Sequence, residues 1–202
     1  MVINRDIYLN RLIASKHNGL IKIITGLRRC GKSYLLFKLF KEHLRNVGVD
    51  DNHIIQVDLE DRRNKNLRNP DVLLAHIDSK MKDNDMYYIL LDEVQCVKDF
   101  EDVLNSYLKI ENADIYETGS NSKFLSTDII TEFRGRGTQI CVHPLSFAEI
   151  MSVDQRHPID VWNDYYTYGG LPLVLSLSTD EAKESYLKDL YAKVYKGSLL
   201  NT

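Results

Sequence analysis

The sequence predicts an α/β fold in which a mostly parallel sheet carries helices on both faces. Strand-like and helix-like segments alternate over most of the chain, and the helical segments of about a dozen residues are long enough for the crossovers that parallel strands need. In addition, Met86–Asp92 is a continuous apolar run, which is typical of a strand buried on both faces. Together these patterns indicate repeated βαβ units.

The first half of the chain supplies three of the expected strands, which are Leu20–Thr25, His53–Leu59 and Met86–Asp92. A short amphipathic helix precedes the first strand, since apolar residues recur at helical spacing from Ile3 and Asn18-Gly19 provides a stop signal. Lys32–Leu44 places its apolar residues on one helical face. Asn69-Pro70 is a favourable start for the next helix.

The second half continues the alternation and then becomes helical. Phe100–Leu108 has an apolar helical stripe, and Ala113–Gly119 and Thr138–Val142 are the expected fourth and fifth strands. After His143-Pro144 only helical patterns follow. We therefore expect an α/β core at residues 1–150, which includes the N-terminal helix, and a small helical piece at residues 151–202.

Composition points to an intracellular globular protein. A hydrophobic content of 44% in 202 residues is normal for one main core, and 26 basic against 29 acidic residues do not favour a polyanion as the default partner. Three widely spaced cysteines indicate reduced thiols rather than a disulfide framework or a zinc site. Neither a signal peptide nor a membrane span is expected from the apolar runs, so we expect a cytoplasmic location and no membrane partner.

Gly26–Ser33 reads GLRRCGKS and fits the phosphate-binding pattern G-x-x-x-x-G-K-[ST] between a predicted strand and a predicted helix. In such a loop, backbone N–H groups surround the phosphates at a helix N-terminus; Lys32 reaches the β- and γ-phosphates and Ser33 ligates Mg²⁺. The alternative is an ordinary strand–turn–helix with a solvated lysine. The expected nucleotide-binding residues are Gly26, Leu27, Arg28, Arg29, Cys30, Gly31, Lys32, Ser33 and Tyr34.

Cys30 has a setting that lowers a thiol pKa, because it lies near a helix N-terminus and beside Arg28 and Arg29. We expect a reactive thiol whose alkylation blocks nucleotide binding and is slowed by bound ATP. A buried, inert thiol is the alternative.

Asp92 and Glu93 end the buried apolar strand, at the sheet edge where the phosphate loop also lies. Asp92 is expected to hold Mg²⁺, together with Ser33, and Glu93 to polarise the attacking water. The alternative is an acidic start to the next helix. A glutamate after the metal aspartate favours a nucleotide hydrolase over a small-molecule kinase, and the nearest string to a guanine-reading motif, NKNL at Asn64–Leu67, lacks its aspartate. ATP is therefore the expected nucleotide.

The stretch ETGSNS ends the fourth strand with short polar side chains at Thr118, Ser120 and Asn121. One of them is expected to sense the γ-phosphate or to orient the water, and Asn121 is our catalytic candidate. Turn formation and helix capping explain any single one of them equally well.

In the order of its motifs, the sequence resembles the predicted AAA+ ATPases of bacteria and archaea. These motifs are GLRRCGKS, LLDEVQ, TGSNS, RGRG (residues 134–137), PLSFAEI and YGGLP. The resemblance implies a P-loop core of the ASCE type, a three-layer sandwich with strand order 5-1-4-3-2, a helical lid, and ATP hydrolysis coupled to a conformational change. It also implies Arg136 as the arginine that meets the γ-phosphate, in cis or from a neighbouring subunit, and Pro172 as a contact for adenine.

Two residues depart from the family pattern. Glu117 occupies a position of the fourth strand that is usually apolar, and no arginine beyond Arg156 is present in the helical piece to serve as a lid arginine. Members of the family are usually about twice as long, so the resemblance also implies that this chain is a fragment.

We expect a Mg²⁺-dependent ATPase that acts as a switch or motor, with self-association or a protein partner. Two alternatives stay open: a nucleotide-binding interaction module with little turnover, and a nucleic-acid-associated ATPase. The basic loop with Arg62, Arg63, Lys65 and Arg68 supports the last one weakly, because it lacks interleaved aromatic residues.

Overall fold

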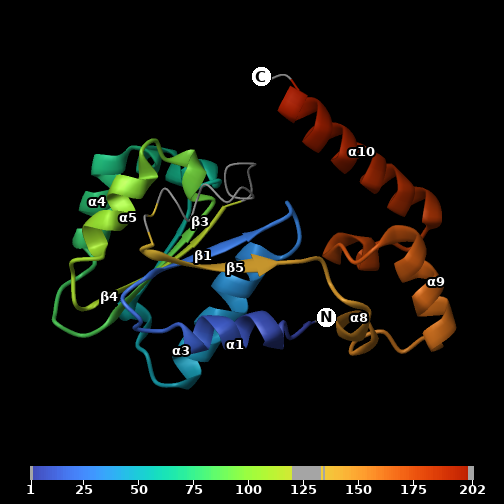
Figure 1. The fold of residues 1–202 in the computed structure, drawn as a ribbon, viewed down its shortest axis with the longest axis horizontal. Coiled ribbons are helices and arrows are strands. Elements are labelled where there is room, and N and C mark those ends of the chain that lie inside the picture. Colours follow the sequence, from blue (N-terminus) through green and yellow to red (C-terminus); the bar gives the residue numbers. More distant parts are fainter. Residues whose placement is uncertain (1, 120–132, 134, 200–202) are drawn as a thin grey trace. The chain divides into compact units, whose positions relative to one another are not determined.

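The computed structural model describes residues 2–119, 133 and 135–199 (Figure 1). The chain forms two compact units, one from Arg5 to Val142 and one that combines Met1–Asn4 with His143–Thr202. The chain therefore passes between the units twice, at Asn4-Arg5 and at Val142-His143. We call them the α/β unit and the helical unit.

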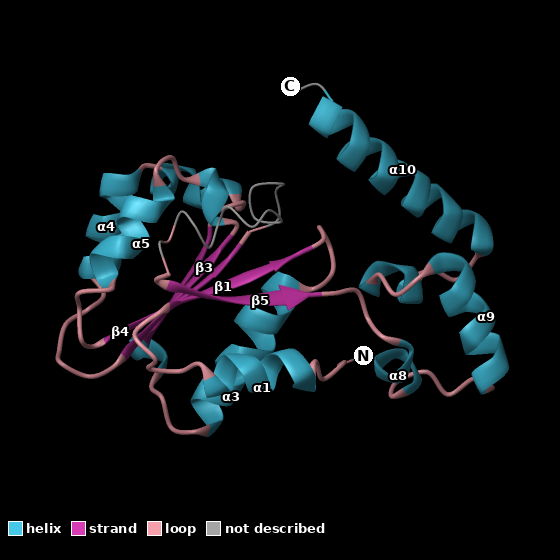
Figure 2. Ribbon diagram, viewed as in Figure 1, coloured by secondary structure: helices cyan, strands magenta, loops and turns pink. Residues whose placement is uncertain are grey.

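The α/β unit contains a five-stranded sheet in which all neighbouring strands are parallel. The spatial order is β2-β3-β4-β1-β5, which confirms the expected order 5-1-4-3-2. Figure 2 draws the strands in magenta. The phosphate loop follows the inner strand β1. It lies next to the end of β4, where Thr118 is located. The strands are β1 (Ile21–Gly26), β2 (Ile54–Asp58), β3 (Tyr87–Asp92), β4 (Ala113–Thr118) and β5 (Gly137–Val142).

Helices cover both faces of this sheet, as Figure 1 shows. The bounds are α1 (Asp6–Ala14), α2 (Lys32–Tyr34), α3 (Lys41–Asn46), α4 (Pro70–Asp78) and α5 (Phe100–Tyr107). A π-helical segment at Leu35–Phe40 joins α2 to α3, so the predicted helix after the phosphate loop is continuous. Asn69 caps α4 through its side chain, and Pro70 occupies the first turn, as the sequence predicts.

Alternate side chains of the strands enter two separate apolar layers. Ile23 of β1 packs in the layer with α4 and α5, whereas Ile24 packs in the layer with α1 and the α2–α3 helix. The expected apolar face of that helix is buried, namely Leu35, Leu36, Leu39, Phe40 and Leu44. All six residues of β3 are buried, which agrees with a strand covered on both faces.

A polar cluster is buried within the second of these layers. Lys22 of β1 is fully buried and forms an ion pair with Asp114 of β4, and Tyr116 donates a hydrogen bond to the same carboxylate at 2.8 Å. The Lys22 ammonium also lies over the Tyr116 ring, 5.1 Å from its centre, which is within the roughly 6 Å reach of a cation–π contact. Because each polar group has a partner, the strands tolerate a charge at their centre.

The helical unit contains α8 (Phe147–Met151), α9 (Pro158–Tyr168), a 3₁₀ turn at Pro172–Ser176 and α10 (Asp180–Leu199). Ser146 and Glu149 form a reciprocal capping box at the start of α8. The Leu145 N–H donates to the Gly170 carbonyl at 2.7 Å, so the PLSF and GGLP motifs pair with each other. None of the helices in the described part of the chain is long and apolar enough to cross a bilayer.

Candidate nucleotide site

The loop between β1 and α2 has the backbone of an anion cradle. Arg29 and Gly31 are both left-handed, with φ of 66° and 99°. A left-handed residue after a right-handed one turns successive N–H groups toward the same side, which forms a concave nest that binds anions. Gly31 occupies the N-cap of α2, so the nest opens at a helix N-terminus, and glycine adopts this conformation without strain.

Lys32 lies over this loop with its side chain largely buried. It is 4% exposed, and its Nζ donates to the carbonyls of Gly26 and Leu27 at 3.1 and 3.0 Å. The alternative of a solvated lysine is therefore wrong. An ammonium group held beside inward-facing N–H groups is suited to a polyphosphate.

Cys30 does not present its thiol to the cradle. The side chain is fully buried, its Sγ donates to the carbonyl of Val142 at 3.3 Å, and its N–H donates to the Leu27 carbonyl at 3.3 Å. Burial raises the pKa of the Cys30 thiol, against smaller opposing contributions from Lys32 and Arg5. The prediction of a low thiol pKa is wrong, because desolvation outweighs the neighbouring positive charges.

Two carboxylates stand beside the loop, where β3 ends. Thr118 at the end of β4 joins them: its Oγ1 donates to Asp92 Oδ1 at 2.5 Å and accepts the Glu93 N–H at 3.0 Å. Burial raises the pKa of Asp92, while hydrogen bonds from Thr118 and Ser33 lower it. The Ser33 hydroxyl therefore lies near the Asp92 carboxylate. These oxygen donors fit Mg²⁺, which prefers hard oxygen ligands.

Glu93 has a left-handed backbone, with φ of 54°. Gln95 donates a hydrogen bond from Nε2 to Glu93 Oε2. The Glu93 side chain makes no capping bond to the 3₁₀ turn Val94–Cys96 that follows it, and α5 begins only at Phe100. The alternative of an acidic helix cap therefore lacks support, and the carboxylate is held by a side chain instead.

The remaining loop residues lie at its surface. Leu27 and Tyr34 are 52% and 37% exposed, and Arg28 donates from Nη2 to Glu60 at 2.9 Å. Asn121 and Ser120 lie outside the described residues.

In the basic loop, Arg63 pairs with Asp61, and Arg68 donates to the carbonyls of Leu59 and Glu60. Part of the hydrogen-bonding capacity of these two arginines is therefore used within the loop itself.

Arg136 lies at the opposite edge of the sheet from the phosphate loop. Its carbonyl accepts the N–H of Ile21, the first residue of β1, and its Nη1 donates to Asn105 at 3.3 Å. The six residues of β1 separate it from the loop, which is roughly 17 Å or more of extended chain. Because the parallel strands β1 and β5 begin at the same end of the sheet, Arg136 lies at the start of β1 and the phosphate loop lies at its end. The prediction that Arg136 contacts the γ-phosphate in cis is therefore wrong. A contact from a neighbouring subunit stays a prediction.

Pro172 begins the 3₁₀ turn of the helical unit, and its contact with adenine stays a prediction.

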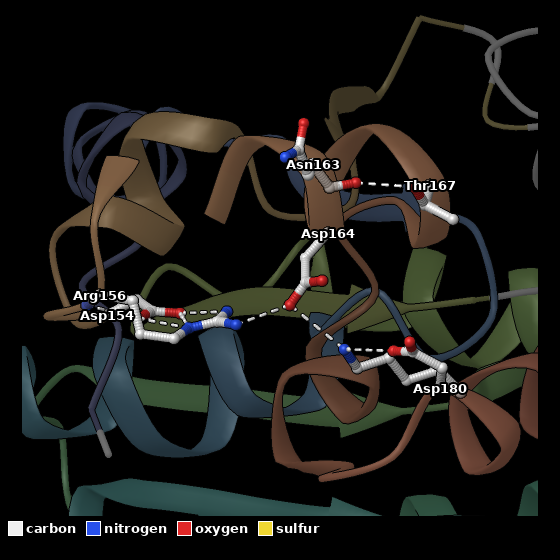
Figure 3. Close-up of polar contacts among 7 residues, drawn as sticks. Asp154, Arg156, Asn163, Asp164, Thr167 and Asp180 are labelled. Atoms are coloured by element: carbon white, nitrogen blue, oxygen red, sulfur yellow. Dashed lines mark hydrogen bonds and ion pairs between the residues drawn. The ribbon is translucent and has the colours of Figure 1, made fainter. Parts of the chain in front are cut away.

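In the helical unit, Arg156 donates hydrogen bonds to Asp154 and to Asp164, both at 2.8 Å, and Figure 3 shows these contacts as dashed lines. Lys183 shares Asp164 at 3.2 Å. These side chains line a cavity of about 240 Å³. Arg156 and Lys183 both pair with carboxylates of the helical unit. The observed contacts of Arg156 are thus those of a residue that stabilises this unit.

Two residues complete the site beyond the motif itself. Thr118 was one of three polar candidates in the sequence, and only the structure shows that it contacts both Asp92 and Glu93. Arg5 gave no sequence signal. It is 2% exposed and its Nη1 donates to the Cys30 carbonyl inside the loop at 2.9 Å.

Comparisons with known proteins concern the sequence and the fold of the chain, and the sequence comparisons come first. The sequence model of a family described as "AAA domain" matches residues 18–151. An uncharacterized protein of Haemophilus influenzae is 32% identical over 199 residues, which are 96% of this chain and 49% of that protein. An uncharacterized protein of Methanocaldococcus jannaschii is 30% identical over 204 residues, covering 93% of this chain and 42% of that protein. The chain thus spans about half the length of these curated relatives or less.

Solved structures show the same fold at low sequence identity. AMPPCP-bound DnaA from Aquifex aeolicus has a TM-score of 0.50 and 14% identity, covering 96% of this chain and 63% of that one. The Aeropyrum pernix ORC1 protein, solved in complex with DNA, has a TM-score of 0.50 and 13% identity, covering 76% of this chain and 48% of that one. At such identities the likeness concerns the fold.

Proposed function

The chain belongs to the AAA domain family, and from this premise we propose that it binds ATP with Mg²⁺ and hydrolyses it, as a conformational switch or motor. The observation that carries the proposal is Thr118, which bonds both Asp92 and the Glu93 N–H. Thr118 therefore holds the Asp92 carboxylate and the backbone from which the Glu93 side chain extends, and Gln95 bonds the Glu93 carboxylate itself. A site that only bound nucleotide would not need the second carboxylate to be positioned.

Binding is assigned to the loop and the start of α2. The N–H groups around Arg29 and Gly31 receive the phosphates, and Lys32 exchanges its bonds to loop carbonyls for bonds to phosphate oxygens. Ser33 and Asp92 are the residues that would hold Mg²⁺. When bound, the ion would neutralise charge on the phosphate oxygens.

Hydrolysis is assigned to Glu93, with Thr118 and Gln95 as the groups that orient it. The Glu93 carboxylate accepts a proton from the attacking water as the water oxygen bonds to the γ-phosphorus, while the bond from that phosphorus to the β–γ bridging oxygen breaks and ADP leaves. Asn121, Arg136 from a second subunit and Pro172 keep their predicted roles within this proposal. We also assign the lid function to the helical unit.

The test of this function is a Glu93→Gln substitution, which leaves a side chain of the same size without a basic carboxylate. We expect Mg-ATP affinity within a few fold of the parent and a kcat lower by roughly 10², because a positioned base acts only on the way to the transition state. Binding is measured by calorimetry and turnover by phosphate release.

Glu111→Gln is the matched control, because it makes the same chemical change at an exposed position before β4. It should leave both quantities unchanged. Equal kcat for the parent and Glu93→Gln would refute the catalytic role. Tight Mg-ATP binding by a parent chain that shows no turnover, even when concentrated enough to self-associate, would instead support the interaction-module alternative.

A further inference from the structure

We infer that Arg5 positions the phosphate loop by holding the Cys30 carbonyl, and that this bond ties nucleotide binding to the chain connections between the two units. The inference rests on the proposed nucleotide site. Arg5 precedes α1, and its guanidinium lies 4.7 Å from the centre of the Tyr8 ring. The residue is almost fully buried, so its donor is fixed by packing as well as by the 2.9 Å bond to Cys30.

The bond determines the orientation of a peptide group. A trans peptide is planar and its C=O and N–H point in opposite directions. When Arg5 holds the Cys30 carbonyl on the inner side of the loop, the Gly31 N–H of the same peptide points to the other side. That N–H belongs to the nest formed around the left-handed residues Arg29 and Gly31.

Without Arg5 this peptide has an easy alternative. Glycine has little preference between positive and negative φ, so the Cys30–Gly31 peptide can rotate at small cost. Rotation would turn the carbonyl oxygen toward the phosphates and remove one N–H from the nest. A charge-assisted hydrogen bond to the carbonyl is strong enough to favour one of the two orientations.

Cys30 also connects the loop to both ends of the α/β unit. Arg5 is the first residue of that unit and Val142 is its last. The Cys30 carbonyl accepts from Arg5, and the Cys30 thiol donates to the Val142 carbonyl. A change in the loop when phosphate binds or leaves therefore acts directly on the two points where the chain enters and leaves the unit.

The experiment compares Arg5→Lys and Arg5→Ala with Arg11→Ala, which removes the same charge from an exposed position of α1. ADP and AMP affinities are measured by calorimetry. The position of the Gly31 amide is followed by ¹H–¹⁵N NMR in the nucleotide-free protein. ADP carries the β-phosphate that the nest binds and AMP does not, so the ratio of the two affinities reports the loop rather than overall folding.

We expect Arg5→Ala to weaken ADP binding about tenfold, the effect of one charge-assisted hydrogen bond, with AMP affinity changed less than about twofold. Arg5→Lys should lie between Arg5→Ala and the parent, and Arg11→Ala should match the parent. The Gly31 resonance should move in both Arg5 variants. Should Arg5→Ala fail to fold, Arg5→Lys provides the same test with a smaller effect.

If Arg5→Ala weakened the binding of ADP and of AMP by the same factor, the inference would be overturned. A Gly31 resonance that stays at its parent position in Arg5→Lys would also overturn it. If the parent binds neither nucleotide, the proposed function fails. The Gly31 resonance then still tests the inferred hold of Arg5 on the loop, since it is recorded without nucleotide.

Discussion

The thiol of Cys30 is directed into the α/β unit, and this gives a testable order of cysteine reactivity. Cys30 is buried and its pKa is raised by burial, whereas Cys141 is exposed. We expect an aromatic disulfide reagent to modify Cys141 first and Cys30 only when the protein unfolds, so that Cys30 reacts slowly without nucleotide and still more slowly when Mg-ATP stabilises the folded state. Cys30→Ser should remove only the slow phase. Fast modification of Cys30 in the folded protein, slowed by ATP, would contradict this expectation.

Glu117 of β4 is fully buried, and among the described residues neither of its carboxylate oxygens has a hydrogen-bond partner. Burial, and to a smaller extent the charge of Glu101, raises the pKa of Glu117 well above 4.5. The folded state thus holds a proton that the unfolded state releases. Stability from this protonated form is complete below the unfolded pKa and is lost as the pH rises through the folded one.

We therefore expect Glu117→Leu to increase the free energy of unfolding at pH 8 by about 1–3 kcal/mol, because it removes a buried polar group without a partner. The gain should be smaller at pH 5, which is closer to the ordinary carboxyl pKa of 4.5, because fewer unfolded molecules have then released the proton. Urea unfolding at the two pH values measures the difference. An exposed Glu111→Gln variant should follow the parent, and a Glu117→Leu protein that is less stable than the parent at pH 8 would show that the carboxylate has a stabilising partner.

The residues of the site differ in how far local sequence determines them. The loop, Asp92 and Glu93 follow from contiguous motifs, because their geometry depends on a strand–loop–helix and on a strand end. Arg5 reaches Cys30 only through tertiary packing, and no spacing rule connects the two. The burial of the Cys30 thiol also depends on tertiary packing. The position of Arg136 depends on the pairing of β1 with β5, which begin side by side.

At the scale of elements, the end of β1 depends on a close approach to β5. A Cβ at Gly26 would lie 2.1 Å from the Val142 carbonyl oxygen, and φ at this residue is 142°. We expect Gly26→Ala to lower the free energy of unfolding by about 3 kcal/mol or more, since neither backbone can move without breaking the strand pair.

Gly48→Ala is the comparison, because Gly48 also has positive φ, 92°, but its Cβ would have nothing within 4 Å. It should cost only about 1 kcal/mol, the strain of a left-handed alanine. Chemical unfolding of both variants gives the two values. Similar losses would mean that β5 moves away from Gly26 more easily than its position in the sheet indicates.

Strand and helix identities were predictable from the sequence because their periodicities are strong, and the observed strand bounds differ from the expected ones by at most one residue at either end. The π-helical segment Leu35–Phe40 was not predictable from the sequence, because its apolar residues fit an ordinary α-helix equally well. Lys22 within a buried strand has no local explanation either. Its partner Asp114 belongs to another strand, and only the sheet order brings them together.

For the whole molecule, nucleotide binding should appear as a stability increase. A ligand that binds only the folded state adds RT ln(1 + [L]/Kd), which is about 2.7 kcal/mol at a hundredfold excess over Kd. We expect Mg-ATP to raise the melting temperature of the parent and Lys32→Ala to lose most of this rise. Lys38→Ala, an exposed lysine of the same helix, should keep it. A parent melting temperature that is unchanged in millimolar Mg-ATP would contradict the nucleotide site.

The parallel sheet also determines when the protein can finish folding. β1 is formed by Ile21–Gly26, yet one of its two neighbours is β5, and Ile21 pairs with Gly137. The ribosome must therefore have synthesised nearly the whole α/β unit before this pair can close, and until then one edge of an apolar strand lacks its partner. We therefore expect this strand order to make the α/β unit fold late during synthesis.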